Sequence, residues 1–350
     1  MIEAATPAAL ARAVALLEAG ELVAFPTETV YGLGADAANP QAVARIFAAK
    51  GRPSDHPVIV HLADQAGLAH WAAAVPAAAS ALAERFWPGP LTLILRRARG
   101  VPDAVTGGQD TVGVRCPAHP VAQALLQAFA QAGGSGALAA PSANRFGRIS
   151  PTTAQHVQSE FGQRVPLILD GGSCDVGIES TIVDLSRERP VLLRPGHIGA
   201  AALQACLGEP VWLPDGSPAL ADGVPDAHDR PSQEGAAPRA SGTLAAHYAP
   251  VTPMALVASQ DLPARIDAVL AAGGSAAVWS RTAVPAQSGV LWRQAPAEAA
   301  AYARQLYAVL REFDAAGVTQ LLIEAPPMDA AWAAVHDRLG RAVTGSGVRS

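Results

Sequence analysis

Cysteine and aromatic residues are scarce in this chain of 350 residues, and long apolar runs are missing. Three isolated cysteines without a Cys-x-x-Cys pair exclude a disulfide framework and the usual zinc or dithiol motifs, and they fit a reducing cytoplasm. No apolar run approaches the length that crosses a bilayer, and the first ten residues lack the basic and apolar regions of a secretory signal. We therefore expect a cytoplasmic protein without a membrane anchor.

The common signatures of nucleotide and catalytic sites are absent as well. There is no GxxxxGK[ST] loop, and no GxGxxG sequence opens a helix after a strand. HExxH, GxSxG and an acidic calcium loop do not occur either. Any nucleotide site in this chain must therefore be built in a different way.

Lysine is nearly absent from the basic residues. Of 25 lysines and arginines only Lys50 is a lysine, which leaves 24 arginines. A lone lysine is a candidate for work that a guanidinium cannot do, because an ammonium is a compact point charge, and a chance surface position is the alternative. The net charge of −5 argues against an extended nucleic-acid surface.

The chain is long enough for two domains, and half of its residues are hydrophobic. In residues 1–207 helices and strands alternate irregularly, and several strands follow one another directly, which favours a mixed sheet with helices. Residues 27–35 are predicted as turn and loop. Helices are expected at 7–20, 40–50, 77–86, 118–131 and 152–161, and strands at 21–25, 58–62, 91–96, 112–115, 137–140, 167–170, 180–185 and 191–193.

A composition change separates this part from the rest. Residues 208–250 are rich in proline and glycine and predict a long linker, partly disordered at its middle, that could act as a lid. Alternating strands and helices over residues 251–350 predict a small parallel α/β domain. Its strands are expected at 254–258, 276–279 and 320–324, and its helices at 262–272, 297–316 and 330–342.

Five polar or glycine-rich stretches of the first domain border strands, where binding sites form. They span residues 25–34, 50–57, 141–150, 170–181 and 193–196. Together they offer cations, hydroxyls and free backbone amides, which is the inventory that a polyphosphate requires. Because no acid–base carboxylate pair or Ser/His/Asp order is recognisable, positioning and electrostatics are expected to carry the chemistry.

Each candidate also has a structural alternative. Ser142 and Asn144 could cap the helix that follows them. Arg115 could belong to a structural ion pair, and His61 could be a core histidine with its hydrogen bonds satisfied. Two carboxylates in these stretches could be ordinary solvated groups: Glu28 and Glu179.

The motifs of the first 207 residues resemble the Sua5/YrdC/YwlC family. They are the run Phe25-Pro-Thr-Glu-Thr-Val-Tyr-Gly-Leu-Gly34, Lys50-x-Arg52, Trp87-Pro-Gly-Pro-Leu-Thr92, Ser142-x-Asn144, Gly177-Ile-Glu-Ser-Thr181 and Leu192-Leu-Arg-Pro-Gly196. The resemblance covers residues 8–207. Ser241-Gly-Thr-Leu-Ala-Ala-His-Tyr-Ala-Pro250 and Phe313-Asp-Ala-Ala-Gly317 resemble the C-terminal domain of the two-domain members.

This resemblance implies a fold and an activity. The fold would be a YrdC-like twisted mixed sheet with helices forming a concave pocket, plus a small Rossmann-like parallel α/β domain. The activity would be that of a nucleotidyltransferase that makes threonylcarbamoyl-AMP and pyrophosphate from L-threonine, bicarbonate and ATP, with Mg²⁺. A downstream transferase complex would pass the threonylcarbamoyl group to adenosine 37 of tRNAs that read ANN codons, and no stable tRNA binding by this chain is expected.

The resemblance also implies roles for individual residues. Phosphate-holding positions are Lys50, Arg52, Ser142 and Asn144. Further nucleotide-contacting positions are Ser54, Thr111, Ser150, Arg194 and, at the end of the linker, Tyr248. Positions on the threonine side are Thr27, His61, Arg115, Ala140 and Ser180, and Arg115 would pair with the threonine carboxylate.

Two segments depart from the family pattern. Thr243-Leu-Ala-Ala precedes His247-Tyr248 where the family has a Met-Lys-Tyr-x-His-Tyr-like segment, and Asp329-Ala-Ala331 replaces a Gly-Leu-Gly turn. An RNA-binding module of the same fold is one alternative, for which Arg96, Arg97 and Arg99 would be the basic cluster. A carbamoyltransferase that uses carbamoyl phosphate is the other, although the chain lacks the acylphosphatase-like part and zinc-finger cysteines found beside this domain in larger proteins.

Overall fold

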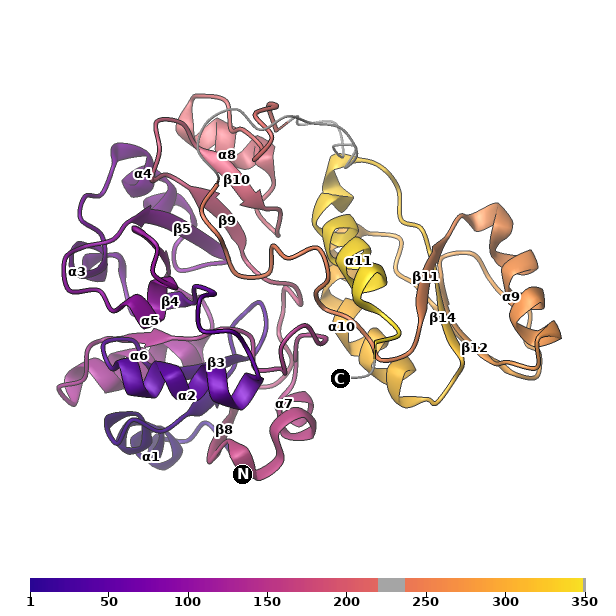
Figure 1. Cartoon of the computed structure of the whole chain (residues 1–350), viewed down its shortest axis with the longest axis horizontal. Helices are drawn as coiled ribbons and strands as arrows, with labels where there is room; N and C mark the ends of the chain where they lie inside the picture. Colours follow the sequence, from indigo (N-terminus) through magenta and orange to yellow (C-terminus); the bar gives the residue numbers. More distant parts are fainter. Residues whose placement is uncertain (220–236, 349–350) are drawn as a thin grey trace. The chain divides into compact units, whose positions relative to one another are not determined.

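The computed structural model describes residues 1–219 and 237–348, which form two units (Figure 1). The first unit comprises Met1–Phe146 and Ser150–Thr243, and the second comprises Gly147–Ile149 and Leu244–Ser350. The described part of the predicted linker is divided between them at Thr243. The middle of that linker, predicted to be disordered, falls in residues 220–236, outside the described residues.

Ten strands of the described chain form one mixed sheet in the first unit. Their order is β1-β8-β2-β3-β7-β4-β6-β5-β9-β10, with parallel pairing for β1–β8, β8–β2, β4–β6 and β5–β9 and antiparallel pairing for the others. The mixed sheet predicted from the sequence is therefore confirmed. The strands are β1 (Ile2–Ala4), β2 (Val23–Phe25), β3 (Gly32–Asp36), β4 (Ile59–Leu62), β5 (Leu91–Arg96), β6 (Thr111–Arg115), β7 (Ala137–Ala139), β8 (Leu167–Asp170), β9 (Thr181–Asp184) and β10 (Val191–Arg194).

The helices of the first unit begin where capping residues predict. Thr6 and Asn39 accept hydrogen bonds from the first-turn amides of the helices that follow them, and a proline occupies the first helical position in both cases. Gly51 closes the second of these helices in the left-handed conformation. The helices are α1 (Pro7–Glu18), α2 (Pro40–Lys50), α3 (Leu68–Trp71), α4 (Ala77–Phe86), α5 (Asp103–Thr106), α6 (Pro120–Gln131), α7 (Ala154–Phe161) and α8 (Ala200–Leu207), with short 3₁₀ turns at Gln65–Gly67 and Gly162–Arg164.

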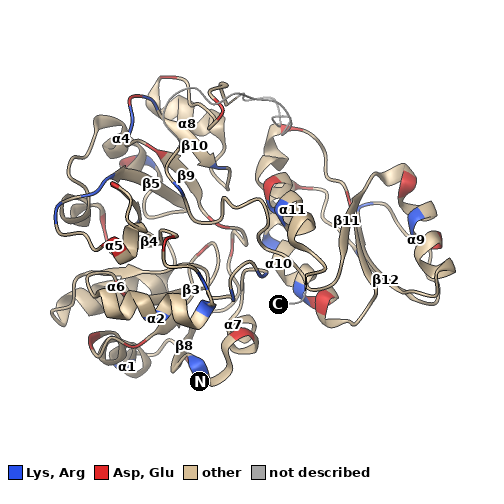
Figure 2. Cartoon of the chain, in the orientation of Figure 1, with Lys and Arg blue, Asp and Glu red and all other residues tan. Residues whose placement is uncertain are grey.

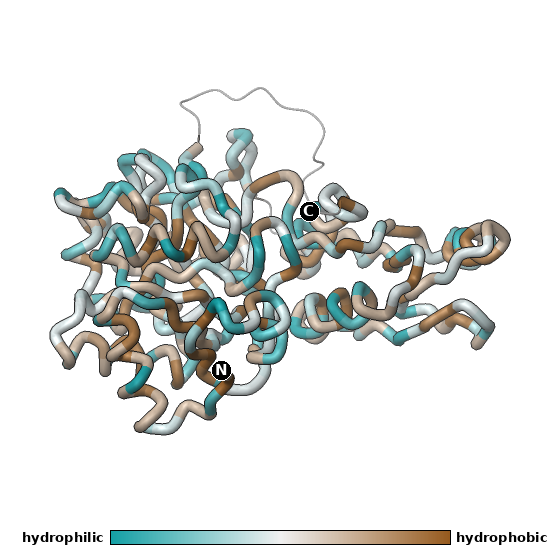
Figure 3. The backbone as a smooth tube through the Cα atoms, turned by 60° about the horizontal axis from the view of Figure 1, so that its bottom comes forward, coloured by the Kyte–Doolittle hydropathy of each residue, from teal (hydrophilic) through white to brown (hydrophobic). Residues whose placement is uncertain are grey.

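The helices cover the two faces of this sheet unequally. Helices α2, α4, α5, α7 and α8 contribute to one core, whereas α1 and α6 pack together over the other face beside β2, β7 and β8. Because successive strand residues point to opposite faces, Ala24 joins the first core while Val23 and Phe25 join the second. In Figure 3 hydrophobic and hydrophilic stretches alternate along the tube, as expected for elements that bury one side.

One prediction for this unit is wrong: residues 27–35 were expected to be turn and loop, but Gly32–Asp36 forms strand β3 in the middle of the sheet. The glycines of this stretch suggested a turn, but in the structure Gly34 allows the ring of Phe25 to pack closely against the backbone of β3. A Cβ at Gly34 would lie 2.7 Å from Cε1 of Phe25 on the neighbouring strand. Strand β1 and helices α3, α5 and α8 were not predicted, because short elements carry little periodic signal.

The second unit is a small parallel α/β domain, as the sequence predicts. Its strands follow the order β11-β14-β12-β13, and all three pairings are parallel. Helix α9 lies on one side of this sheet, and α10 and α11 lie on the other (Figure 1). The elements are β11 (Met254–Val257), α9 (Leu262–Ala271), β12 (Ala276–Ser280), β13 (Val290–Gln294), α10 (Ala299–Ala315), β14 (Gln320–Glu324) and α11 (Ala333–Gly345), with 3₁₀ turns at Ser259–Asp261 and Ala330–Trp332. Strand β13 was not predicted.

None of the helices in the described part of the chain combines the length and the apolarity that a membrane span requires.

Candidate active site

The central strands of the first unit bring two threonine-side candidates together. Strands β4 and β6 are parallel neighbours in a register that pairs His61 with Arg115. His61 lies two residues after Ile59 and therefore on the same face, the one opposite the core that α2 and α4 share. On this face, Ile59 packs with residues of β5, β9 and β10 and with Ala240 from the linker. These two candidates therefore lie on the sheet face against which Ala240 of the linker packs.

The loop containing Ser142 and Asn144 lies against the start of β3. Gly32 and Ser142 form an antiparallel bridge, and the Ala143 amide donates to the Tyr31 carbonyl at 2.8 Å. Strand order explains this contact, because β7, which leads into this loop, is the neighbour of β3. Two motifs more than a hundred residues apart in sequence therefore form one surface.

Lys50, the last residue of α2, is buried beneath this loop. Its Nζ donates to the backbone carbonyls of Ser142 and Asn144, each at 2.5 Å, and the residue is only 4% exposed. Burial lowers the pKa of the Lys50 ammonium well below its ordinary value, the nearby Arg52 charge lowers it further, and Glu160 opposes both. The surface alternative for Lys50 is therefore wrong, and an ammonium with two of its three N–H groups on carbonyls can direct the third at a ligand.

Arg115 is held in a buried cluster of polar groups. Its Nη2 donates to Oε1 of Glu28 at 2.6 Å, its Nη1 to Oγ1 of Thr29 at 2.9 Å, and its Nε to the Gly89 carbonyl at 3.3 Å. The other oxygen of Glu28 accepts from the Ala118 amide. A guanidinium has five N–H groups, so among the described residues one N–H on each terminal nitrogen has no protein partner. That pair matches the two oxygens of a carboxylate.

His61 is a neutral imidazole. Burial, and then the charge of Arg115, lower its pKa to about 3. Its Nδ1 lies 3.3 Å from the Ile59 carbonyl, and its ring meets Phe25 edge-on at a centroid distance of 6.2 Å. His61 can therefore donate or accept a hydrogen bond at neutral pH, but it supplies no positive charge.

Ser180, just before β9, joins the two sides of the site. Its Oγ lies 2.7 Å from Oγ1 of Thr92 and accepts from Nη2 of Arg194 at 3.1 Å, while its carbonyl accepts from Nε of Arg194. Arg194 is 2% exposed. Arg194, which is predicted to contact the nucleotide, thus orients Ser180, which is predicted to lie on the threonine side.

The end of the linker contacts two of the predicted nucleotide residues. The Ser241 carbonyl accepts from Nη1 of Arg194 at 2.7 Å, and its Oγ donates to the Pro57 carbonyl at 2.9 Å. Nη2 of Arg52 donates to the same Pro57 carbonyl at 2.7 Å and lies 3.5 Å from Oγ of Ser241. Described linker residues therefore lie against both arginines.

Ser150 is fully buried, and its Oγ donates to Oε1 of Glu179 at 2.5 Å. Glu179 is thereby a buried carboxylate beside a predicted nucleotide residue, so its solvated alternative is wrong, as it is for Glu28. Within residues 1–219 and 237–348, no three His, Cys, Asp or Glu side chains gather into a group that could hold a metal ion.

The remaining candidates are less closely connected. Thr27 is buried, and its hydroxyl donates to the Val30 carbonyl at 2.6 Å; Ala140 follows β7 and is 5% exposed. Ser54 is exposed on the loop after α2, and Thr111 begins β6. Tyr248 belongs to the second unit, where its buried ring lies 5.6 Å from that of Tyr307.

Sequence reasoning missed four residues that support the site: Glu28, Thr92, Glu179 and Ser241. Glu28 and Glu179 lie inside motifs already singled out, and their position among buried neighbours was the available signal. Thr92 ends the Trp-Pro-Gly-Pro-Leu-Thr run, where strand alternation places it on the Ile94 face. Ser241 begins the Ser241–Pro250 run that resembles the two-domain members, but nothing in that run pointed to a contact with the arginines of the first unit.

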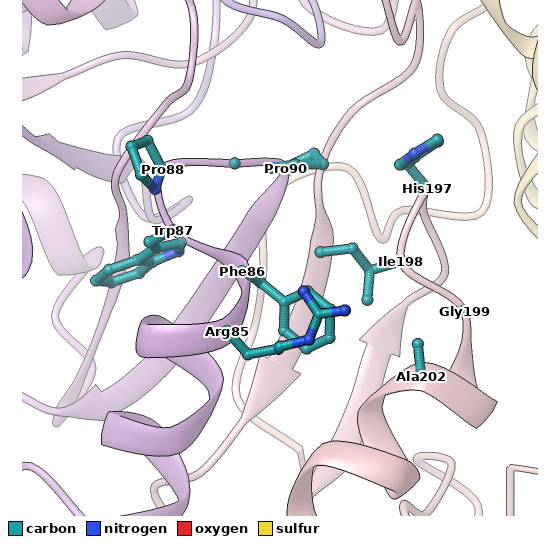
Figure 4. Close-up of a pocket in the computed structure, with 10 residues that line it drawn as sticks. Arg85, Phe86, Trp87, Pro88, Pro90, His197, Ile198, Gly199 and Ala202 are labelled. Atoms are coloured by element: carbon teal, nitrogen blue, oxygen red, sulfur yellow. The ribbon is translucent and has the colours of Figure 1, made fainter.

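A separate cavity of about 400 Å³ lies at the end of α4 (Figure 4). Arg85 lies over the ring of Phe86 at 5.2 Å and faces the loop that carries His197 and Ile198. Gly89, whose carbonyl supports Arg115, forms part of its wall. None of the predicted site residues lines this cavity.

Charges around the first unit are mixed in sign. Figure 2 shows acidic and basic positions interspersed over its ribbon. In the predicted basic cluster, Nε of Arg96 donates to the Ser186 carbonyl at 3.1 Å, and Arg97 pairs with Asp103. These arginines are engaged in local contacts rather than presented as a basic strip.

A mixed α/β sheet that buries one lysine, two arginines and several hydroxyls, followed by a parallel α/β unit, defines the class of two-domain YrdC-type enzymes. The Sua5_yciO_yrdC family, described as "Telomere recombination", matches residues 15–196, and the family described as "Threonylcarbamoyl-AMP synthase, C-terminal domain" matches residues 198–344. The chain belongs to the threonylcarbamoyl-AMP synthase family, in its two-domain Sua5-type form.

Individual relatives agree with this assignment. The threonylcarbamoyl-AMP synthase of Bacillus subtilis is 38% identical over 354 residues, which cover 97% of this chain and 94% of that protein. The enzyme of Pyrococcus abyssi is 49% identical over 197 residues, 56% of each chain. The solved structure of Pyrococcus abyssi Sua5 complexed with L-threonine matches with a TM-score of 0.81 and 36% identity, covering 96% of this chain and 94% of that one.

Proposed function

We propose that the first-unit site makes threonylcarbamoyl-AMP from L-threonine, bicarbonate and ATP and releases pyrophosphate. The observation that carries this proposal is the guanidinium of Arg115, which is buried and oriented, and which keeps one N–H on each terminal nitrogen for a carboxylate. The similarity to the L-threonine complex of Pyrococcus abyssi Sua5 supports threonine as the owner of that carboxylate.

The residues on the threonine side of the proposed site are all buried. Arg115 would hold the carboxylate, and the neutral His61 and the hydroxyl of Ser180 would offer hydrogen bonds to the rest of the amino acid. Thr27 and Ala140 complete this side. A buried site with fixed polar groups favours the ligand that satisfies all of them, which supports threonine over amino acids without a hydroxyl.

The nucleotide side relies on Lys50. Two N–H groups of the Lys50 ammonium are bound to carbonyls of the loop that contains Ser142 and Asn144, so the position of the ammonium is fixed before the ligand arrives. Its third N–H group would then donate to a phosphate oxygen. Arg52 and Arg194 add charge, and Ser54, Thr111 and Ser150 add hydroxyls. A triphosphate would restore the charged form that burial disfavours at Lys50.

The chemistry then requires positioning. Threonine's amine is carboxylated by bicarbonate with loss of water, and the resulting carbamate oxygen attacks the α-phosphorus in line. The bond from that phosphorus to pyrophosphate breaks as Lys50 and Arg52 stabilise the leaving charge. Mg²⁺ fits this site as an ion carried on the triphosphate, because it is usually held by phosphate oxygens and one or two carboxylates, and Glu179 supplies a buried carboxylate beside Ser150.

The proposal extends to the linker and to the product. The contacts of Ser241 with Arg194 and Arg52 support a lid over the nucleotide that would exclude water from a labile adenylate. The contact between Tyr248 and the nucleotide stays a prediction. In the cytoplasm, the adenylate would pass to a transferase complex that modifies adenosine 37 of ANN-reading tRNAs, without stable tRNA binding by this chain.

A direct assay tests the proposal. Pure protein is incubated with ATP, Mg²⁺, labelled bicarbonate and each amino acid in turn, and pyrophosphate and labelled adenylate are measured. We expect both products only with threonine. Product from carbamoyl phosphate without bicarbonate would indicate the carbamoyltransferase, and tight RNA binding without any adenylate would indicate the RNA-binding module; either result would refute the proposal.

A further inference from the structure

The tripeptide Gly147–Ile149 belongs to the second unit, although its neighbours in sequence, Phe146 and Ser150, belong to the first. Its backbone runs parallel to the chain that enters the second unit: Arg148 forms a parallel bridge with Ala249. The Ala249 amide donates to the Gly147 carbonyl at 2.9 Å. The tripeptide is thus incorporated into the second unit by backbone hydrogen bonding.

Side chains of the second unit secure the same tripeptide. Nη2 of Arg148 donates to the carbonyl of Val348, after α11, at 3.2 Å. Nη2 of Arg311, on α10, donates to the carbonyl of Ile149, a residue that is 4% exposed. All of these contacts lie within the second unit, and they engage each residue of the tripeptide.

The Arg311 contact bears on Ser150 through covalent geometry. The Ile149 carbonyl and the Ser150 amide are parts of one planar peptide group, so fixing the carbonyl fixes the direction of the amide. The Ser150 side chain is in turn bound to Glu179. On the other side of the tripeptide, the Asn144 carbonyl accepts from Lys50, and the Phe146 amide donates to the Lys50 carbonyl at 2.9 Å.

Residues 144–150 are therefore fixed at both ends. Lys50 holds the beginning of this segment, and Arg311 holds the peptide that precedes Ser150. A guanidinium bound to a carbonyl is a charge-assisted hydrogen bond, stronger than a bond between neutral groups. Loss of this bond would remove one of the contacts that fix the peptide before Ser150, while the contacts of Lys50 at the other end would remain.

We propose that Arg311 is a positioning residue for the nucleotide, and that the second unit thereby sets the geometry of Ser150. This inference rests on the proposed function, because the nucleotide roles of Ser150 and Asn144 belong to it. It assigns a task to the C-terminal domain that requires no ligand of its own. Threonine-side residues are not connected to the tripeptide by any of these contacts, so the effect should be confined to ATP.

The test compares Arg311→Ala and Arg311→Lys with Glu312→Gln as the matched control. Glu312 is the next residue on α10, is half-exposed and pairs with Arg293. We expect Arg311→Ala to weaken ATP affinity, measured by calorimetry, and to raise the KM for ATP by about tenfold, the effect of one lost charge-assisted hydrogen bond. Threonine affinity should change less than twofold. Arg311→Lys should be intermediate, and Glu312→Gln should match the wild type.

Hydrogen exchange gives a readout that does not need the reaction. Amides of residues 147–150 should exchange faster in Arg311→Ala and at the wild-type rate in Glu312→Gln. Equal weakening of ATP and threonine binding, or wild-type ATP affinity in Arg311→Ala, would overturn the inference. A wild-type protein that binds ATP but makes no adenylate would overturn the proposed function alone, and one that binds no ATP would overturn both.

Discussion

Nη2 of Arg115 lies 2.6 Å from Oε1 of Glu28, and both side chains are almost completely buried. An ion pair removed from water in this way is weak evidence for stability, since desolvation offsets much of the attraction. It does orient both side chains, because the Ala118 amide donates to the Glu28 carboxylate and the Thr29 hydroxyl accepts from the Arg115 guanidinium. The pair keeps the guanidinium in place before threonine arrives.

Replacing Glu28 should make the stability of the folded protein depend more strongly on bound threonine. Glu28→Gln keeps the size of the side chain but leaves the Arg115 charge uncompensated, which we expect to lower the unfolding free energy by about 3 kcal/mol. Threonine would supply a new carboxylate, so its stabilising effect in a thermal shift assay should exceed that in the wild type. Glu21→Gln, which disrupts only an exposed pair with Arg45, is the control. Equal threonine shifts in all three proteins would contradict the prediction.

Arg115 should govern threonine far more than ATP. Arg115→Ala is expected to raise the KM for threonine by about a hundredfold, with a much smaller change in the KM for ATP, because a bidentate contact to a carboxylate is lost. The double variant Arg115→Met with Glu28→Gln removes both charges and should recover much of the stability but not the threonine response. Similar increases in both KM values would mean that Arg115 is structural or belongs to the phosphate side.

Lys50 should not tolerate arginine. Its Nζ fits between two carbonyl oxygens at 2.5 Å, where a planar fork has no room. We expect Lys50→Arg to lose about a hundredfold or more in kcat/KM. Lys50→Met, which keeps the shape without the charge, should abolish the ATP-induced thermal shift while the threonine-induced shift persists. A near-normal rate for Lys50→Arg would remove Lys50 from the phosphate site.

His61 should make the first unit sensitive to acid. The pKa of His61 is about 3 in the folded protein and about 6.5 in the unfolded chain. Between these two pH values the unfolded chain therefore binds a proton at His61 that the folded protein does not bind. Stability from this group is complete above pH 6.5 and falls as the pH drops towards 3. Between pH 7.5 and 5 the loss is about 2 kcal/mol.

The measurement is the fall in melting temperature between those two pH values. His61→Gln should show a smaller fall than the wild type, whereas His197→Gln, which replaces an exposed histidine, should show the same fall as the wild type. Identical falls in all three proteins would mean that His61 does not titrate between the folded and unfolded states.

Gly34 should not accept a side chain. A Cβ there would lie 2.7 Å from Cε1 of Phe25, so Gly34→Ala is expected to cost about 1–3 kcal/mol of stability. Gly340→Ala, in α11 where no atom lies within 4 Å of the new Cβ, should stabilise by about 0.5–1 kcal/mol. Melting curves of both variants check the contrast, and a neutral Gly34→Ala would mean that the Phe25 ring can move aside.

The sequence predicted those parts of the protein that depend on local signals. Thr6 and Asn39 mark helix starts by capping, and both helices lie where expected. Gly34 misled the prediction, because the same residue suits a turn and a tightly packed strand, and only the ring of Phe25 on the next strand distinguishes them. Pairing across the sheet carries no local signal.

For the site, motifs located the cations but not their partners. Lys50 was recognised from its rarity, yet the two carbonyls that hold it come from a loop over ninety residues later. Glu28 is adjacent to recognised residues, but its pairing with Arg115 joins the loop after β2 to the end of β6, which only the folded sheet brings together. Which polar group meets which is a tertiary property, so it could not be predicted from composition or spacing.

Strand order has a consequence for how the protein is made. Ile2 of β1 pairs with Ile168 of β8, and β7 enters between β3 and β4, which precede it by some eighty to a hundred residues. A ribosome delivers the chain from its N-terminus at about 5–20 residues per second, so the first strand waits roughly 10–30 s for its neighbour. One edge of β2 remains unpaired until β8 emerges, and β3 and β4 lack the strand between them until β7 emerges. Slow translation or chaperone shortage during this interval is expected to reduce the yield of folded protein, and a circular permutation that places β1 near β8 in the sequence would shorten the wait.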